Sequence, residues 1–248
     1  MSRKLVTVIT ASSGNPLLLN NIKSVHNQDH DSIQHIVFID GPGALEKIKA
    51  HNPEVLDYGH SCVDFIELPY SVGRDRWNGH RMYAAGCYFA EGNYVMFLDD
   101  DNTIAPNHML TCLERVKNGS DWTFALRNIV DKDGNEICQD NCESLGEYPS
   151  IINDQDYFID LNCYFLPKLM AIQLSPLMYR KFREPGQPEI DRLLCHVLRN
   201  NFKNFKGTRQ YTVNYTVGNT ERSVQKDFFI NGNKVMLEKY KGELPWKK

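Results

Sequence analysis

Three consecutive aspartates at the end of an apolar run constrain this chain most. The five bulky residues Tyr94–Leu98 leave no polar face, and Asp99, Asp100 and Asp101 follow them directly. A strand without a polar face is typical of the centre of a parallel sheet, where helices cover both sides. We therefore expect the three carboxylates to lie at the carboxyl edge of such a sheet, where ligands of open α/β sheets bind.

The acidic run has two interpretations. Side chains two apart on an extended backbone point the same way, so Asp99 and Asp101 can face one cation while Asp100 faces elsewhere. Oxygen-only ligands favour Mg²⁺ or Mn²⁺, which usually also bind substrate phosphates. Alternatively, the run is a solvated turn in which Asp101 or Asn102 caps the next helix. The apolar strand before it favours the cation site.

Composition excludes several classes of protein. The 248 residues carry 28 Lys and Arg against 31 Asp and Glu, for a net charge of −3, which lacks the basic footprint of a nucleic-acid partner. No apolar run approaches the roughly 20 residues of a transmembrane segment. The strand-like run Leu5–Thr10 follows Met1–Lys4 directly, where a secretory signal would have its apolar region.

The cysteines indicate reduced thiols. Their number is seven, which is odd, and their spacing is not that of a small secreted domain. Cys138, Cys142 and Cys163 lie close in sequence, but no nearby histidine completes a zinc pattern. We expect a cytoplasmic protein without structural zinc.

Strand and helix patterns alternate through the first hundred residues. Strands are predicted at 5–10, 35–40, 63–68 and 94–98, and helices at 17–27, 44–51 and 78–90. This alternation predicts an α/β fold, with a mixed, mostly parallel sheet flanked by helices.

The remainder of the chain is more irregular. It predicts a helix at 106–116, strand-like runs at 122–126 and 128–130, a hairpin turn at 131–134, a helix from 189 and a strand at 210–217. No element is predicted for 219–248. We expect a single domain over 1–248, with one half at 1–101 and the second half, 102–248, built onto the same sheet.

Three segments in order resemble a known family. Leu5–Asn15 resembles the opening strand and loop of family-two glycosyltransferases of the GT-A fold. Ser24–Gln28 followed by Ile36–Gly41 is similar to their S-V-x-N-Q … I-V-V-x-D-G segment, and Glu91–Asp101 to their K-G-E-Y-I-x-F-L-D-x-D segment. The resemblance covers roughly the first 110 residues.

The resemblance implies a metal-dependent, inverting transfer of a sugar from a nucleotide-sugar donor, a UDP-sugar, to the hydroxyl of a glycan or other acceptor. It implies that Asp101 binds Mn²⁺ or Mg²⁺ through the DxD motif, and that Asp99 contacts the ribose or the metal region. Asp40 would bind the nucleotide base, and Thr10 and Ala11 would line the nucleotide pocket. Residues 1–101 would form the nucleotide-binding half, and 102–248 the acceptor-side half with a C-terminal extension.

The catalytic base and the diphosphate contact follow the family less closely. An acidic residue heads a later helix in the family, which implies Asp191 as the base and leaves Glu189 as a competitor. The family often carries an Arg in the helix before the metal strand, but Tyr83–Gly86 stand at those positions. Arg76 or Arg81 would then contact the diphosphate.

Simpler roles remain open for two of these acids. The Asp40 carboxylate could accept backbone N–H bonds within the turn Gly41–Gly43. Asp191 could be an acid that only stabilises the start of a helix through its dipole.

Three other functions compete. A nucleotidyltransferase would share the sheet and the metal site, but Ala11–Pro16 has one glycine and no basic residue. An NAD-binding Rossmann enzyme needs the third glycine of G-x-G-x-x-G, and Glu46 stands there after Gly41–Gly43. The third alternative is a non-catalytic carbohydrate-binding protein on a transferase fold, against which the retained acids argue.

Overall fold

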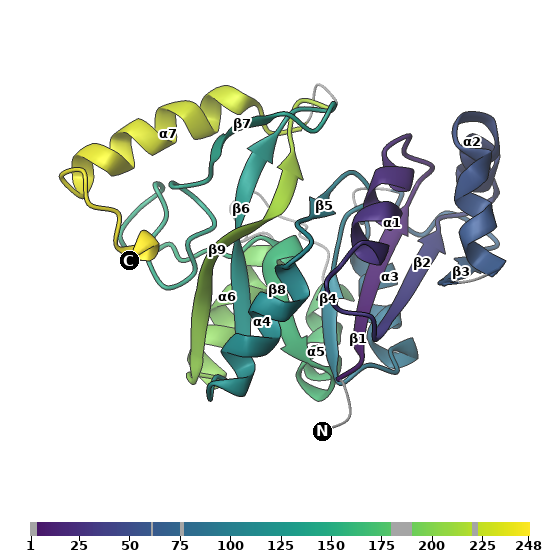
Figure 1. Ribbon diagram of the computed structural model, residues 1–248, viewed down its shortest axis with the longest axis horizontal. Helices are drawn as coiled ribbons and strands as arrows, with labels where there is room; N and C mark the ends of the chain where they lie inside the picture. Colours follow the sequence, from purple (N-terminus) through teal and green to yellow (C-terminus); the bar gives the residue numbers. More distant parts are fainter. Residues whose placement is uncertain (1–3, 61, 75–76, 180–189, 220–222) are drawn as a thin grey trace.

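A nine-stranded mixed sheet forms the centre of the molecule (Figure 1). The computed structural model describes residues 4–60, 62–74, 77–179, 190–219 and 223–248. The strand order is β3-β2-β1-β4-β8-β6-β9-β5, and β7 pairs with β6.

The first half supplies the parallel part of this sheet. β1 (Val6–Ser12) pairs in parallel with β2 (Ile33–Ile39) on one side and β4 (Tyr94–Phe97) on the other, and β3 (Val63–Glu67) lies beyond β2. These are the four predicted strands. Because they are parallel, the residues that follow β1, β2 and β4 meet at one edge of the sheet.

The second half extends the sheet with mixed directions. β8 (Tyr164–Pro167) runs antiparallel to both β4 and β6 (Trp122–Val130), so the residues that precede β8 lie at the same edge as those that follow β4. The long strand β9 (Phe205–Thr216) is parallel to β6 and antiparallel to β5 (Thr103–Ile104). β7 (Glu136–Gln139) forms the predicted hairpin with β6.

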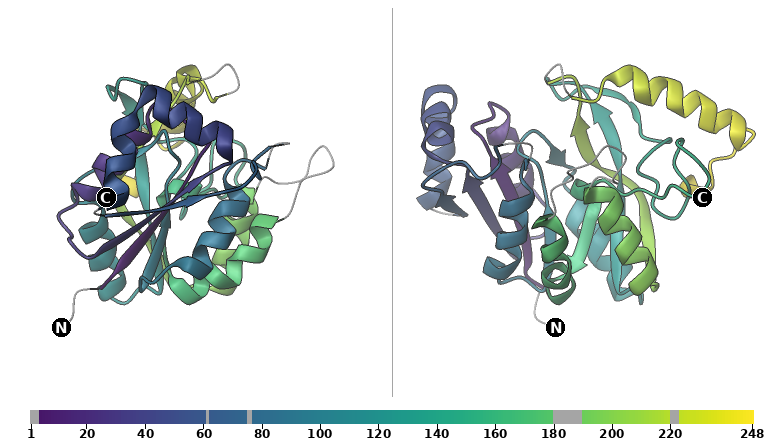
Figure 2. Two further views of the ribbon diagram at one scale, coloured as in Figure 1. Left: turned by 90° about the vertical axis from the view of Figure 1, so that its right-hand side faces the viewer. Right: turned by 180° about the vertical axis from the view of Figure 1, so that it is seen from behind.

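Helices cover both faces of the sheet (Figure 2). One layer contains α3 (His80–Phe89), α5 (Lys168–Leu174), the 3₁₀ helix η3 (Ser175–Tyr179) and α6 (Ile190–Asn201), which contact one another in sequence along the layer. On the other side lie α1 (Leu18–His26) and α4 (His108–Lys117). The remaining helical segments are α2 (Pro42–His51), η1 (Pro53–His60), η2 (Leu161–Cys163), α7 (Lys226–Lys239) and η4 (Pro245–Lys247).

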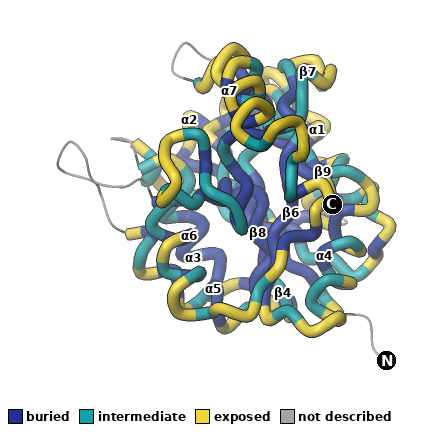
Figure 3. The backbone as a smooth tube through the Cα atoms, turned by 90° about the vertical axis from the view of Figure 1, so that its left-hand side faces the viewer, coloured by how far each residue is buried: buried dark blue, intermediate teal, exposed yellow. Residues whose placement is uncertain are grey.

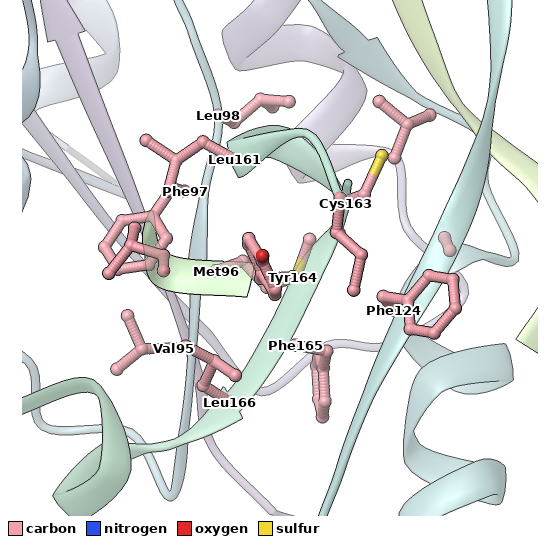
Figure 4. Close-up of a cluster of buried hydrophobic side chains, with 14 of the residues drawn as sticks. Val95, Met96, Phe97, Leu98, Phe124, Leu161, Cys163, Tyr164, Phe165 and Leu166 are labelled. Atoms are coloured by element: carbon pink, nitrogen blue, oxygen red, sulfur yellow. The ribbon is translucent and has the colours of Figure 1, made fainter. Parts of the chain in front are cut away.

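One hydrophobic core runs through both halves. Side chains of β4, β6 and β8 meet around Phe97, Phe124 and Tyr164, all at most 1% exposed (Figure 4). The backbone of these strands is buried at the centre of the molecule, while exposed residues gather on the outer helices and loops (Figure 3). A shared core of this kind makes the chain a single domain.

The C-terminal region departs most from the sequence-based expectation. Helix α7 lies beside the β6–β7 hairpin, far from β2 and β3 in Figure 1, in a region for which no element was predicted. Its sequence includes Gly232 and two asparagines, which lower helix propensity. The glycine is needed for packing, since a Cβ there would lie 2.7 Å from the Cys142 sulfur.

Two strands are also longer than predicted. The runs 122–126 and 128–130 form the one strand β6, and the run predicted at 210–217 is the end of β9, which begins at Phe205. In the described part of the chain, every helix is too short or too polar to cross a lipid bilayer.

Candidate active site

Asp99 is held from two sides directly after β4. The Tyr83 hydroxyl of α3 donates to its Oδ1, and Asn162 Nδ2 donates to its Oδ2 at 2.8 Å. Asn162 Oδ1 in turn accepts the Asp99 backbone N–H at 2.6 Å. Burial raises the pKa of Asp99 above its usual value, although both side-chain hydrogen bonds act against this shift. The carboxylate orientation is therefore fixed by the protein.

Asp101 lies against the end of β9. Its Oδ2 accepts a hydrogen bond from Asn219 Nδ2 at 2.8 Å, and its carbonyl oxygen accepts one from Thr216 Oγ1 at 2.5 Å. Burial, together with the nearby charge of Asp99, raises the pKa of Asp101 to about 6. Burial raises the pKa of Tyr215, and the charges of Asp160, Asp99 and Asp101 raise it further, while Arg127 acts against them.

Asp100 faces the other way, as the alternation along the chain predicts. Its carboxylate bonds to the Ser12 side chain and the Asn15 backbone, in the loop after β1. Burial raises its pKa to about 7. Its Oδ2 is buried and has no hydrogen-bond partner in the described part of the chain.

This acidic turn can supply only some of the ligands that a divalent cation needs. Within the described ranges, no three His, Cys, Asp or Glu side chains are arranged to hold a metal ion by themselves. Mg²⁺ and Mn²⁺ commonly take one or two carboxylates from a protein and their other ligands from phosphates and water. The oxygen-only donor set of Asp99 and Asp101, with the pKa of Asp101 raised, fits such a site.

Asp40 is committed to a neighbouring loop. Its Oδ1 accepts the Val72 N–H at 2.6 Å, and its Oδ2 accepts the Ser71 hydroxyl at 2.7 Å and the Gly73 N–H at 3.1 Å. Asp40 therefore binds backbone N–H groups, but of the loop after β3 and not of the Gly41–Gly43 turn that follows it in sequence. A carboxylate has about four acceptor positions, so one more donor can be accommodated.

The two predicted pocket residues of β1 differ in their surroundings. The Thr10 side chain is fully buried, and its hydroxyl lies 3.1 Å from His35 Nε2 and 3.4 Å from Asn21 Oδ1. That hydroxyl is thus committed to the packing between β1, β2 and α1. Ala11 is partly exposed and lies close to Gly79, where a Cβ would be 3.1 Å from the Ala11 methyl group.

Two predicted site residues, Arg76 and Glu189, lie outside the described residues. Arg81 is described, and its guanidinium carbon lies 3.7 Å from the centroid of the Trp77 ring while NH1 donates to the Val72 carbonyl at 3.4 Å. It therefore braces the loop that holds Asp40. Tyr83 stands where the family often has an arginine, and it binds Asp99.

Asp191, the predicted base, stands at the start of α6. It lies in the first turn of that helix, and its charge is among the causes, after burial, that raise the pKa of Tyr164 in β8. Tyr164 stands two residues after Asn162, which holds Asp99. Asp191 thus acts on the strand that begins two residues after Asn162, the partner of Asp99.

A buried arginine beneath the turn was not predicted. Arg127 of β6 is 1% exposed and binds three carboxylates. Its Nε lies 2.8 Å from Asp140, NH2 lies 2.6 Å from Glu143, and NH1 lies 2.5 Å from Asp160. The only sequence signal was a charged residue between the two strand-like runs 122–126 and 128–130, since the three acids follow no recognisable spacing.

Comparisons with known proteins point to one family. The sequence model described as Glycosyl transferase family 2 matches residues 6–172. No curated protein matches the chain in sequence.

Solved structures share the fold at low identity. Residues 1–349 of TarS from S. aureus match with a TM-score of 0.62 and 15% identity, over 86% of this chain and 60% of that one. The same fragment in complex with UDP-GlcNAc gives 0.63 and 13%, over 95% and 66%. The mannosyltransferase PcManGT from Pyrobaculum calidifontis, in complex with GDP-Man and Mn²⁺, gives 0.57 and 11%, over 90% and 59%. The chain thus spans 59–66% of these solved chains, and 37% of the longer TarS chain.

Proposed function

Because the chain belongs to glycosyl transferase family 2 and has its GT-A-type fold, we propose that it is a metal-dependent, inverting glycosyltransferase. It would move a sugar from a nucleotide-sugar donor to an acceptor hydroxyl. The observation that carries this proposal is the acidic turn Asp99–Asp101, which lies at the carboxyl edge of the parallel strands β1, β2 and β4.

Asp101 and Asp99 would hold the divalent cation. When bound, the cation would neutralise the negative charge that develops on the departing nucleoside diphosphate. Asn219 holds one oxygen of Asp101, while Tyr83 and Asn162 orient Asp99. These contacts leave the two acids ordered before the donor arrives, which reduces the cost of binding.

Asp191 would act as the general base on the acceptor. An inverting transfer needs a group that takes the proton of the attacking hydroxyl, and a positioned carboxylate contributes roughly 10²–10⁴-fold. The support is the place of Asp191 in the first turn of α6 and its charge, which acts on Tyr164, two residues after Asn162. Glu189 is the alternative base.

Residues 1–101 would form the nucleotide-binding half. Asp40 would use its remaining acceptor position for the base, Ala11 and the backbone of Thr10 would line the pocket, and Arg76 would contact the diphosphate. Residues 102–248 would form the acceptor-side half and a C-terminal extension.

UDP is the nucleotide that we propose. TarS has been solved with UDP and with UDP-GlcNAc, whereas PcManGT was solved with GDP-Man and Mn²⁺. The two TarS complexes support UDP over GDP, and the PcManGT complex supports Mn²⁺ as the first metal to test.

A thermal-shift screen tests the proposal. UDP, GDP, dTDP, CDP and NAD are each added with and without Mn²⁺, because a ligand that binds only the folded state raises its stability by mass action. We expect a shift with UDP that needs Mn²⁺ and is lost in Asp101→Asn. The matched control is Asp121→Asn, an exposed acid that accepts a hydrogen bond from Asn204.

The other outcomes are equally decisive. A shift with GDP instead would replace the proposed nucleotide, and a metal-independent shift with NAD would favour a dinucleotide enzyme. A UDP shift that survives in Asp101→Asn would remove the metal assignment. In Asp191→Asn we expect binding of UDP with Mn²⁺ to persist and sugar transfer to be lost; unimpaired transfer would move the base to Glu189.

A further inference from the structure

We propose that the buried ion cluster around Arg127 is a positioning relay that fixes the donor-side acid and the acceptor-side base relative to each other. This inference rests on the proposed function, since it assigns a role to residues that touch neither substrate. We use the name Arg127 cluster for six residues: Arg127, Asp140, Glu143, Asp156, Asp160 and Arg192.

One arm of the relay leads to Asp99. Asp160 binds Arg127 through Oδ2, and its Oδ1 accepts two hydrogen bonds from Asn162, from the backbone N–H at 3.0 Å and from Nδ2 at 2.7 Å. The same Asn162 amide donates to Asp99 Oδ2 and accepts from the Asp99 backbone N–H. With both ends of its side chain bonded, Asn162 has one orientation, and it transmits that orientation to the Asp99 carboxylate.

The other arm leads to the start of α6. Glu143 is shared by two arginines, with Oε2 at 2.6 Å from Arg127 NH2 and Oε1 at 3.1 Å from Arg192 NH2. Arg192 directly follows Asp191, and its NH1 also binds Asp156. The relay therefore fixes the first turn of α6, where the proposed base stands.

An aromatic ring ties the two arginines together. Phe158 is 5% exposed, and its ring centroid lies 5.8 Å from the guanidinium carbon of Arg127 and 4.5 Å from that of Arg192. The two guanidinium groups thus share Glu143 and Phe158, so a displacement of one side chain also disturbs the contacts of the other.

The ion pairs of the Arg127 cluster are not expected to contribute much to the free energy of unfolding by themselves. Four carboxylates face two guanidinium groups, and Arg127, Asp140 and Asp160 are at most 5% exposed. Buried ion pairs often contribute less than an apolar replacement of the same volume, because desolvation offsets their attraction. What such a cluster does provide is directional contacts, which hold groups at fixed separations.

Two substitutions separate the arms. Asn162→Ala cuts the donor arm, and Arg192→Met cuts the acceptor arm by removing the guanidinium while keeping an unbranched, apolar side chain. Arg199→Met is the matched control, because Arg199 lies on the same helix and is partly buried, but it stacks on Tyr157 at 3.7 Å and donates to the Gly146 carbonyl.

Two measurements read the arms independently. Calorimetry gives the Kd of UDP in the presence of Mn²⁺, and hydrolysis of UDP-GlcNAc gives a turnover number with water as the acceptor. In that hydrolysis the water oxygen bonds to the anomeric carbon, the bond to UDP breaks, and the base takes the proton.

We expect a crossed result. Asn162→Ala should raise the Kd of UDP with Mn²⁺ about tenfold, the usual cost of a buried hydrogen bond to a charged group, and should lower the turnover number less. Arg192→Met should lower the turnover number at least tenfold and leave the Kd within about twofold. It should also shift the pH below which the turnover number falls. Arg199→Met should change neither.

The outcomes distinguish this inference from the proposed function. If both variants change both quantities equally, or change only thermal stability as Arg199→Met does, the relay is wrong while the transferase stands. If the unaltered protein neither binds UDP with Mn²⁺ nor hydrolyses UDP-GlcNAc, the proposed UDP-dependent function is wrong, and the relay is wrong with it.

Discussion

The two halves of the molecule order their acids in different ways. In the first half, Asp40 and Asp99 are placed by parallel strands that end at a common edge, and hydrogen bonds from the loop after β3 and from Asn162 hold them there. In the second half, Asp140, Glu143 and Asp160 all lie in the long loop between β7 and η2 and converge on one buried guanidinium. The first arrangement follows from repeating backbone geometry, whereas the second depends on a single side chain.

Removal of the Arg127 guanidinium should have the largest effect on the free energy of unfolding. Arg127→Met leaves three carboxylates without their shared cation, and breaking a buried pair from one side typically costs about 3–5 kcal/mol. We expect a loss of that size in the free energy of unfolding, measured by urea denaturation. Arg192→Met, at a side chain 17% exposed, should cost less. Equal losses for Arg127→Met and Arg192→Met would contradict the idea that the cost of removing a cation depends on its burial.

A pair of glycines compares packing in the two halves. Gly146 has φ +60°, and a Cβ there would lie 2.2 Å from the Phe124 ring, so Gly146→Ala combines backbone strain with overpacking. Gly86 lies in α3 facing Ile9, where a Cβ would be 2.6 Å from Cγ2. We expect losses of about 2–4 kcal/mol for Gly146→Ala and about 1 kcal/mol for Gly86→Ala, because alanine favours the helix. Urea denaturation measures both, and the reverse order would contradict this account.

Buried histidines make the stability depend on pH and test whether the two halves unfold together. Burial lowers the pKa of His35 to about 3 and that of His108 to about 4, from 6.5. The unfolded chain therefore binds protons that the folded chain does not, so stability is complete above pH 6.5 and falls as the pH approaches 4. For His108 the loss is on the order of 1 kcal/mol at pH 5.5.

The variants His35→Gln and His108→Gln should each flatten the pH dependence of the free energy of unfolding. Thermal unfolding followed between pH 7 and pH 5 measures the slope. Because one core spans both halves, each variant should act on the same single transition. Two transitions, each affected by only one variant, would show that the halves unfold separately.

The sequence predicted the parts that repeat a local rule. Apolar strands that end in acids, such as Tyr94–Leu98 before Asp99, predicted the parallel sheet and the position of these acids at its carboxyl edge. Asn162 and Arg127 were not predicted, because their importance depends on which loops meet beside them in space. Helix α7 was not predicted because its buried face contains a glycine, which packing against Cys142 requires.

The order in which the cluster is completed bears on how the chain folds. The three acids lie 13, 16 and 33 residues from Arg127 along the chain, so the β6–β7 hairpin and the loop after it suffice to bring them together. The rings of Tyr215 and Phe229, whose centroids lie 4.3 Å and 5.2 Å from its guanidinium carbon, arrive from much later in the sequence, and such distant pairings form slowly. We therefore expect the Arg127 guanidinium to pair with its carboxylates first, and to be covered by these rings and lose its contact with water afterwards.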